Sequence, residues 1–118
     1  MTTDARELLA VSSKAIRRSK SLYFRLDDAI NLVKECEEKD LAVTRVEGLS
    51  LEHDGILPHL DLILDCLARE VDWTGFSWEQ FRDKCNASAM EFLERTNGRR
   101  DLVFYFNVMR ENEMSLPR

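Results

Sequence analysis

The feature that most constrains this fold is a helix whose two ends are both marked in the sequence. Ser77 can accept a hydrogen bond from the backbone of Gln80, whose side chain can return one to the backbone of Ser77, and this reciprocal capping box is typical of a helix start. Asn97-Gly98 supplies a residue that tolerates the left-handed conformation in which many helices end. The sequence therefore predicts a helix at about 78–96.

Two further stretches predict strands and hence a mixed fold. Residues 102–109 form an almost unbroken apolar run, which is typical of a strand covered on both faces. Residues 41–58 alternate between apolar and polar positions, slip in phase at Gly48, and contain an Asp-Gly pair at 54–55 that favours a tight hairpin turn. We expect an α+β domain in which the final strand lies beside the first strand of this hairpin, with helices over one face.

The first 47 residues contain neither glycine nor proline, so nothing breaks a helix early in the chain. Four apolar residues recur there at every seventh position: Leu9, Ile16, Tyr23 and Ile30. Ser19-Lys20-Ser21 can interrupt the run, because serine prefers caps and turns to helix interiors. The sequence predicts one helix over 4–38 or, as we favour, two with a break at 19–21. The helical region over 1–39 belongs to a single domain of 118 residues.

A further helix is expected at about 59–71. Apolar residues recur there at the spacing of one helical face: Leu60, Ile63, Leu64, Leu67, Ala68 and Val71. A strand over the same segment would leave Ile63 and Leu67 on its polar side, so the helix is the better match. Residues 110–118 are polar and are expected to form a tail.

Composition and cysteine usage limit the class of protein. The apolar runs fall well short of the roughly 18 residues that a membrane span needs, and the first ten residues carry charges where a secretory signal would be apolar. Cys36, Cys66 and Cys85 form no Cys-x-x-Cys pair and fall on predicted apolar faces, so we expect three buried thiols. Together these features predict a cytoplasmic protein that does not enter a membrane.

Charge is distributed unevenly along the chain. Residues 1–25 hold six basic and two acidic side chains, a net charge of +4, whereas the remainder carries −9. An acidic body repels nucleic acid and favours basic partners, so we do not expect strong nucleic-acid binding. The basic face of the predicted N-terminal helices consists of Lys14, Arg17, Arg18 and Arg25.

This basic face leaves two interpretations open. A regulator linked to nucleic acid could use it to contact phosphates. The sharper expectation is that it meets acid on a second copy, with the seven-residue repeat of apolar side chains as the seam of a homodimer through the N-terminal helices.

Histidine and carboxylate residues near the predicted hairpin offer another class of function. His53, His59 and Asp61 are ligand types that suit a transition metal, and a small metal-dependent hydrolase built on them is an alternative to a binding protein. Their spacing matches none of the metal motifs, and neither a Gly-x-Ser-x-Gly elbow nor a phosphate-binding glycine loop occurs. We therefore expect no cofactor and no enzyme activity.

A series of short motifs runs along residues 40–109. They are Val46-Glu47-Gly48, Asp54-Gly55, Pro58, Leu60-Asp61 and Ser77-Trp78-Glu79, followed by the closing apolar strand. In this series the chain resembles small bacterial proteins similar in character to immunity proteins, which neutralise the toxins encoded beside them. The resemblance implies an inhibitory role, but it carries over no catalytic or binding residue.

A non-enzymatic protein-binding module is therefore the first functional hypothesis. A bacterial cytoplasmic inhibitor or immunity-type protein would use its acidic surface to block a basic toxin or effector. The candidate contact residues are seven acids and one aromatic anchor: Glu35, Glu37, Glu38, Asp40, Glu47, Glu52, Asp54 and Trp73. A secretion chaperone or adaptor is a related alternative, distinguished by whether its partner binds as an extended segment.

Overall fold

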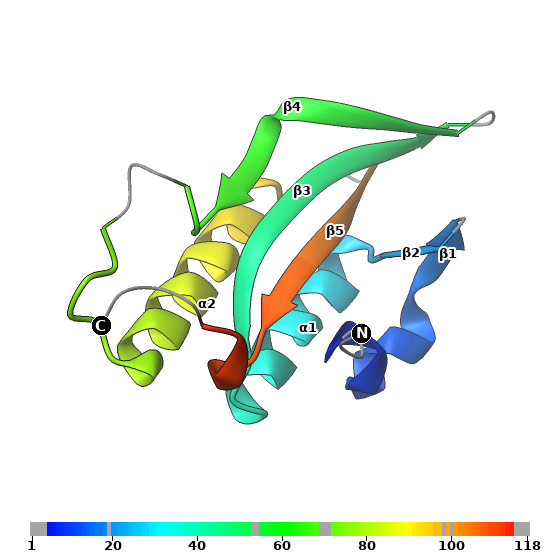
Figure 1. The fold of residues 1–118 in the computed structure, drawn as a ribbon. Coiled ribbons are helices and arrows are strands. Elements are labelled where there is room, and N and C mark those ends of the chain that lie inside the picture. The colour runs from blue at the N-terminus through cyan, green and yellow to red at the C-terminus, as the bar shows by residue number, and fades with distance from the viewer. Residues whose placement is uncertain are drawn as a thin grey trace.

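The structure is a computed structural model that describes residues 5–18, 20–52, 55–68, 72–97, 99 and 101–114 of the chain. Two helices, α1 (Leu26–Glu38) and α2 (Trp78–Arg95), pack against three strands, β3 (Ala42–Glu52), β4 (Gly55–Asp65) and β5 (Leu102–Met109). A two-stranded ribbon, β1 (Ile16–Arg18) and β2 (Ser21–Tyr23), precedes α1. The α+β class expected from the sequence is therefore confirmed (Figure 1).

The three long strands form an antiparallel sheet in the order β4-β3-β5, with β3 at its centre. Both helices lie on the same face of this sheet (Figure 1). Most of the largest fully buried side chains belong to this helix-covered layer, and they include Phe24, Phe81, Phe104 and Phe106. Burial of a phenylalanine contributes about 1.5–3 kcal/mol, so this layer supplies the principal core.

The β1–β2 ribbon continues the sheet beyond β5. Phe24, directly after β2, forms a two-way backbone bridge with Phe104 of β5, with N···O distances of 2.9 and 2.7 Å. On the face away from the helices, a smaller apolar cluster joins the ribbon to the sheet through Tyr23, Leu49 and Val103. β4 and β1 are thus the two outer edges of a nearly continuous sheet.

The helices predicted over 4–38 are wrong for the residues before Leu26. Residues 5–24 instead form two 3-10 turns, η1 (Ala5–Leu8) and η2 (Ala10–Lys14), and then the β1–β2 ribbon. Backbone pairing with the edge of β5 is a long-range contact that outweighs the local helix preference of this segment.

A buried arginine also holds the N-terminal segment in this non-helical form. Arg6 donates a 2.5 Å hydrogen bond to the carbonyl of Phe106, and its guanidinium lies 4.6 Å from the ring centroid of Tyr105. The apolar repeat is therefore divided among three elements and one connection and forms no helical seam for a homodimer: Leu9 lies between the two 3-10 turns, Ile16 in β1, Tyr23 in β2 and Ile30 in α1.

The helix predicted at 59–71 is also wrong, because β4 runs as a strand to Asp65. The backbone of β3 can form hydrogen bonds on both of its sides. The segment that follows the hairpin turn pairs with the backbone groups on one of these sides only when it is extended. Ile63 and Leu67 are exposed in the structure. Apolar side chains at these polar positions of a strand are the reason why the sequence pattern favoured a helix. The hairpin is correspondingly longer than the expected 41–58.

Other expectations are confirmed. The capping box of Ser77 and Gln80 opens α2, the final strand covers 102–109 beside β3, and the pairing of β3 with β4 shifts in register around Gly48. Cys36, Cys66 and Cys85 are all buried free thiols, and burial raises the pKa of Cys36 to about 12.

The C-terminal segment is only partly the polar tail that was expected. η3 (Glu111–Glu113) is exposed, but Met114 after it is buried in an apolar cluster with Trp73, Trp78 and Phe81. In the described part of the chain, no helix is both long and apolar enough to span a membrane.

Candidate functional site

β4 forms one outer edge of the sheet and bends sharply along its length (Figure 1). Its pairing jumps from Ile63 opposite Glu47 to Pro58 opposite Leu49, so residues 59–62 have no directly paired residue in β3 and form a bulge beside Gly48. The Cβ of Leu62 lies 3.0 Å from the position that a Cβ on residue 48 would take. A glycine at this position therefore allows the bulged strand to approach β3 closely.

The bulged strand exposes more large apolar side chains than the other elements described. Leu57, Leu60 and Ile63 of β4 are 51%, 81% and 38% exposed, and Leu67 just after it is 43% exposed. Leu8 in η1, at 56%, is the remaining exposed large apolar residue of the described chain. Exposed apolar side chains that cluster along an edge strand mark an interaction site or an aggregation hazard.

The same segment is acidic. Residues 46–68, which we call the acidic hairpin, contain five acidic side chains and no lysine or arginine: Glu47, Glu52, Asp54, Asp61 and Asp65. Edge strands are commonly protected by lysine, and this one has Pro58 and the bulge but no basic residue. An unpaired edge with apolar and acidic side chains suits a basic segment better than an acidic one.

Ion pairs with Arg45, which directly precedes the acidic hairpin, engage two of these acids. Arg45 of β3 donates to Glu47 Oε1 at 2.6 and 2.9 Å and to Asp65 Oδ2 at 2.9 Å. Glu52 and Asp61 are exposed and make no ion pair with any described residue, and Asp54 lies outside the described residues. The acids of the hairpin that remain available to a partner are therefore Glu52 and Asp61.

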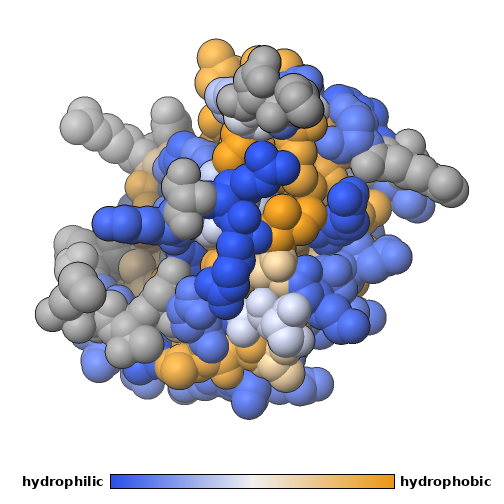
Figure 2. Space-filling model, turned by 90° about the vertical axis from the view of Figure 1, so that its right-hand side faces the viewer, coloured by the Kyte–Doolittle hydropathy of each residue, from blue (hydrophilic) through white to orange (hydrophobic). Residues whose placement is uncertain are grey.

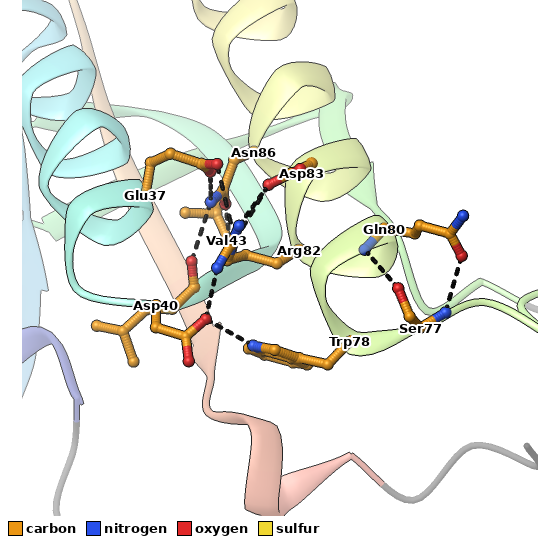
Figure 3. Close-up of polar contacts among 10 residues, drawn as sticks. Glu37, Asp40, Val43, Ser77, Trp78, Gln80, Arg82, Asp83 and Asn86 are labelled. Atoms are coloured by element: carbon orange, nitrogen blue, oxygen red, sulfur yellow. Dashed lines mark hydrogen bonds and ion pairs between the residues drawn. The ribbon is translucent and has the colours of Figure 1, made fainter.

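Candidate acids at the end of α1 are largely used inside the molecule (Figure 3). Arg82 of α2 binds Asp40 at 2.6 Å and approaches Glu37 at 3.7 Å. Asp40 also accepts a 2.7 Å hydrogen bond from the indole of Trp78, and these donors lower the pKa of the Asp40 carboxyl. Glu37 and Asp40 thus connect α1 and the turn after it to α2.

Glu35 and Glu38 complete the set of predicted acids. Glu35 accepts a 2.5 Å hydrogen bond from the backbone of Ala10 and so holds η2 against α1. Glu38 is exposed and makes no ion pair within the described ranges. The seven candidates among the described residues therefore do not gather into one patch.

Asn86 is a buried polar residue that the sequence analysis did not identify. Its amide oxygen accepts from the backbone nitrogen of Val43 at 2.8 Å, and its amide nitrogen donates to the carbonyl of Leu41 at 2.9 Å and to Glu37 at 2.5 Å (Figure 3). Val43 lies where the pairing of β3 with β5 shifts in register. Asn86 therefore satisfies backbone groups that the irregular strand leaves unpaired.

Trp73 is not an exposed anchor, which corrects the prediction from the sequence. Its side chain is 7% exposed, its indole nitrogen donates to the carbonyl of Cys66 at 2.6 Å, and its ring packs edge-on against Phe76 and Phe81. A tryptophan with its ring and its N–H both satisfied internally covers the core rather than binding a partner.

The proposed metal ligands do not assemble in the part of the chain that is described. His59 Nε2 lies 2.6 Å from Ser50 Oγ, whose other neighbour is Asp101 at 3.4 Å, and Asp61 is exposed on β4. Asp101 contacts the serine and not the imidazole, so these groups do not have the order of a Ser–His–Asp triad. Among described residues no group of three or more metal-binding side chains occurs, and His53 lies outside them.

The basic candidates lie in and around the β1–β2 ribbon rather than on the face of one helix, which corrects that expectation. Lys14 ends η2, Arg17 and Arg18 lie in β1, and Arg25 precedes α1. All four are exposed, and Arg17 lies 3.5 Å from Glu7. Figure 2 views the molecule from the side of this ribbon and shows apolar side chains near the top of the face with hydrophilic ones on both sides.

No protein-family model matches the chain, and a search of curated proteins gives no match.

Proposed function

We propose that this chain is a non-enzymatic protein-binding module, a bacterial cytoplasmic inhibitor of the immunity type that neutralises a basic partner. The surface that would contact the partner is the acidic hairpin, residues 46–68. Glu52 is one of the acids expected from the sequence to contact a partner, and it would be joined by the leucines of β4 and by Asp61, which the sequence suggested only as a metal ligand. Glu37, Asp40 and Trp73 would instead have structural roles.

The observation that carries the proposal is the outer edge of β4. It combines Leu57 and Leu60, which are more than half exposed, with the unpaired carboxylate of Asp61 on a strand with no partner strand beyond it in the described chain. Apolar side chains would supply the buried centre of an interface, and the acids would form a charged rim that speeds encounter with a basic surface.

A secretion chaperone or adaptor is a second candidate, and the same edge favours it. A free strand edge binds extended segments by adding a strand, with main-chain hydrogen bonds giving affinity and side-chain pockets giving specificity. An immunity-type inhibitor would bind its partner in the folded state, whereas an adaptor would bind the same partner better after it has been unfolded.

The experiment compares three tagged baits expressed in the native cell: the wild type, Leu60→Asp in β4, and Leu8→Asp as a control at an exposed leucine outside the hairpin. We expect the wild type and the control to capture the same basic protein, with the neighbouring gene product as first suspect. Leu60→Asp should weaken this capture about tenfold or more, because interface centres commonly lose over 1.4 kcal/mol.

A second step tests inhibition. Purified wild type, added in equal amount to the captured protein, should abolish that protein's activity, and Leu60→Asp should not. Equal capture by all three baits, an acidic partner, or a partner whose activity is unaffected would contradict the proposed function.

A further inference from the structure

We propose that copies of this protein associate head to tail, with the basic β1 edge of one copy on the acidic β4 edge of the next. This inference rests on the proposed function, because it uses the same β4 surface. A second copy of this chain would occupy that surface until a partner displaces it.

The β1 edge is basic and has no partner strand beyond it among the described residues. β1 pairs with β2 through Ile16–Arg18, and its other side carries no strand in that part of the chain. Residues 8–26 include Lys14, Arg17, Arg18, Lys20 and Arg25 and contain no acidic residue. Arg18 and Lys20 are exposed and make no ion pair within the described ranges.

The opposite edge has the complementary chemistry. The acidic hairpin has no lysine or arginine, and Glu52 and Asp61 are exposed there. Because the bridge between Phe24 and Phe104 joins the ribbon to β5, the two edges belong to one nearly continuous sheet whose ends differ in the sign of their charge. Pairing β1 of one copy with β4 of another continues that sheet and brings opposite charges together.

Charge also selects this arrangement over the symmetric ones. Two β4 edges placed side by side would bring Asp61 near the acids of the other hairpin, and two β1 edges would bring arginines together. Like charges directly opposite each other destabilise a strand pair. The contact is therefore between different surfaces, and such contacts build open chains unless the rotation between copies closes a ring.

The test is the molar mass in solution, measured by light scattering across a concentration series and at low and high salt. Wild type should rise from the 13.8 kDa of one chain to at least double that mass at millimolar concentration, and should fall back at high salt, which screens exposed charges. Wild type that keeps the mass of one chain at millimolar concentration and low salt would overturn the proposal.

Two charge-reversed variants identify the surfaces. Arg18→Glu with Lys20→Glu reverses the two basic side chains of the β1 side that make no ion pair with a described residue, and Glu52→Lys with Asp61→Lys reverses the two acids of the hairpin that make none; all four positions are exposed. Each variant alone should keep the mass of one chain, and the equimolar mixture should associate again because the reversed edges complement each other. Association of either variant alone at the wild-type level, or a mixture that stays monomeric, would also overturn the proposal.

This experiment contains no partner protein. A monomeric wild type therefore leaves the proposed inhibitor function standing, and failure to capture a basic partner leaves the self-association standing. Circular dichroism of each variant, matched to the wild type, shows that a lost association does not come from lost folding.

Discussion

The helix-covered layer and the acidic hairpin are two regions of the same sheet that differ in how far their side chains are exposed. In the layer, Phe104 and Phe106 are fully buried, and Asn86 satisfies buried backbone groups of β3 and of the turn before it. In the hairpin, Leu60 is the most exposed large apolar side chain described, and Asp61 has no ion pair with any described residue. The difference teaches that stability and binding can be assigned to different residues and tested separately.

The largest effect is expected in the principal core. Phe104→Ala should lower the free energy of unfolding by about 3–5 kcal/mol, because it removes a fully buried ring and leaves a cavity. Leu60→Ala in the hairpin should change it by less than about 0.5 kcal/mol. Urea unfolding of both variants measures the contrast, and a comparable loss for Leu60→Ala would show that β4 is covered.

The next effect concerns the polar part of the same layer. Asn86→Ala should cost about 2–3 kcal/mol of stability, since it leaves the buried nitrogen of Val43 and the carbonyl of Leu41 without partners. Asn31→Ala, at an exposed position of α1, is the matched control and should be nearly neutral. If the two variants unfold at the same urea concentration, Asn86 does not have the role described.

At the bulge, a single added methyl group on residue 48 should lower the stability of the fold. Gly48→Ala places a Cβ 3.0 Å from the Cβ of Leu62 and should destabilise the fold by about 1–2 kcal/mol through overpacking. The double variant Gly48→Ala with Leu62→Gly removes the Cβ of residue 62 and so makes room for the new methyl group. A double-mutant cycle should therefore show that the two changes are less harmful together than their sum, and strictly additive effects would contradict the close approach.

The smallest effect is a dependence on pH at the end of α1. The lowered pKa of Asp40 means that its ionised form stabilises the fold above the unfolded pKa of about 3.9 and that this stabilisation is lost as the pH falls through the lower, folded value. Asp40→Asn should therefore cost less than about 1 kcal/mol near pH 6, because the carboxylate is largely exposed, and should cost less near pH 2 than near pH 6.

The exposed carboxylate of the hairpin provides the control for this titration. Asp61→Asn should leave stability unchanged at both pH values, because Asp61 has no ion pair with a described residue. A pH-independent loss for Asp40→Asn would mean that the bond to Arg82 does not form.

The helix-covered layer and the acidic hairpin also differ in how well their secondary structure could be predicted from the sequence. α2 and β5 were correctly placed, because the capping box at Ser77 and the apolar run at 102–109 are local patterns that tertiary contacts reinforce. The start of β4 was correctly expected in the hairpin, but the part from residue 59 onward was assigned to a helix, because its apolar spacing fits a helical face better than a strand. The apolar spacing gave the wrong prediction there because the exposed side chains of an edge strand do not pack into the core.

The candidate site was predictable in its charge but not in its geometry. The absence of basic residues over 46–68 is visible in the sequence, whereas the ion pairs that engage Glu37 and Asp40 join segments about forty residues apart. No local pattern marks Asn86 as buried or Trp73 as part of the core. The 3-10 turns and the ribbon of residues 5–24 depend on pairing with β5, which propensity alone does not encode.

Amide hydrogen exchange, measured with and without the captured basic partner, tests the central claim most directly. We expect the amides of β4 to become protected when the partner is added, while those of α2 and β5 stay as slow as they are in the free protein. Protection that appears on the β1–β2 ribbon or on α2 and leaves β4 unchanged would contradict the assignment of binding to the acidic hairpin.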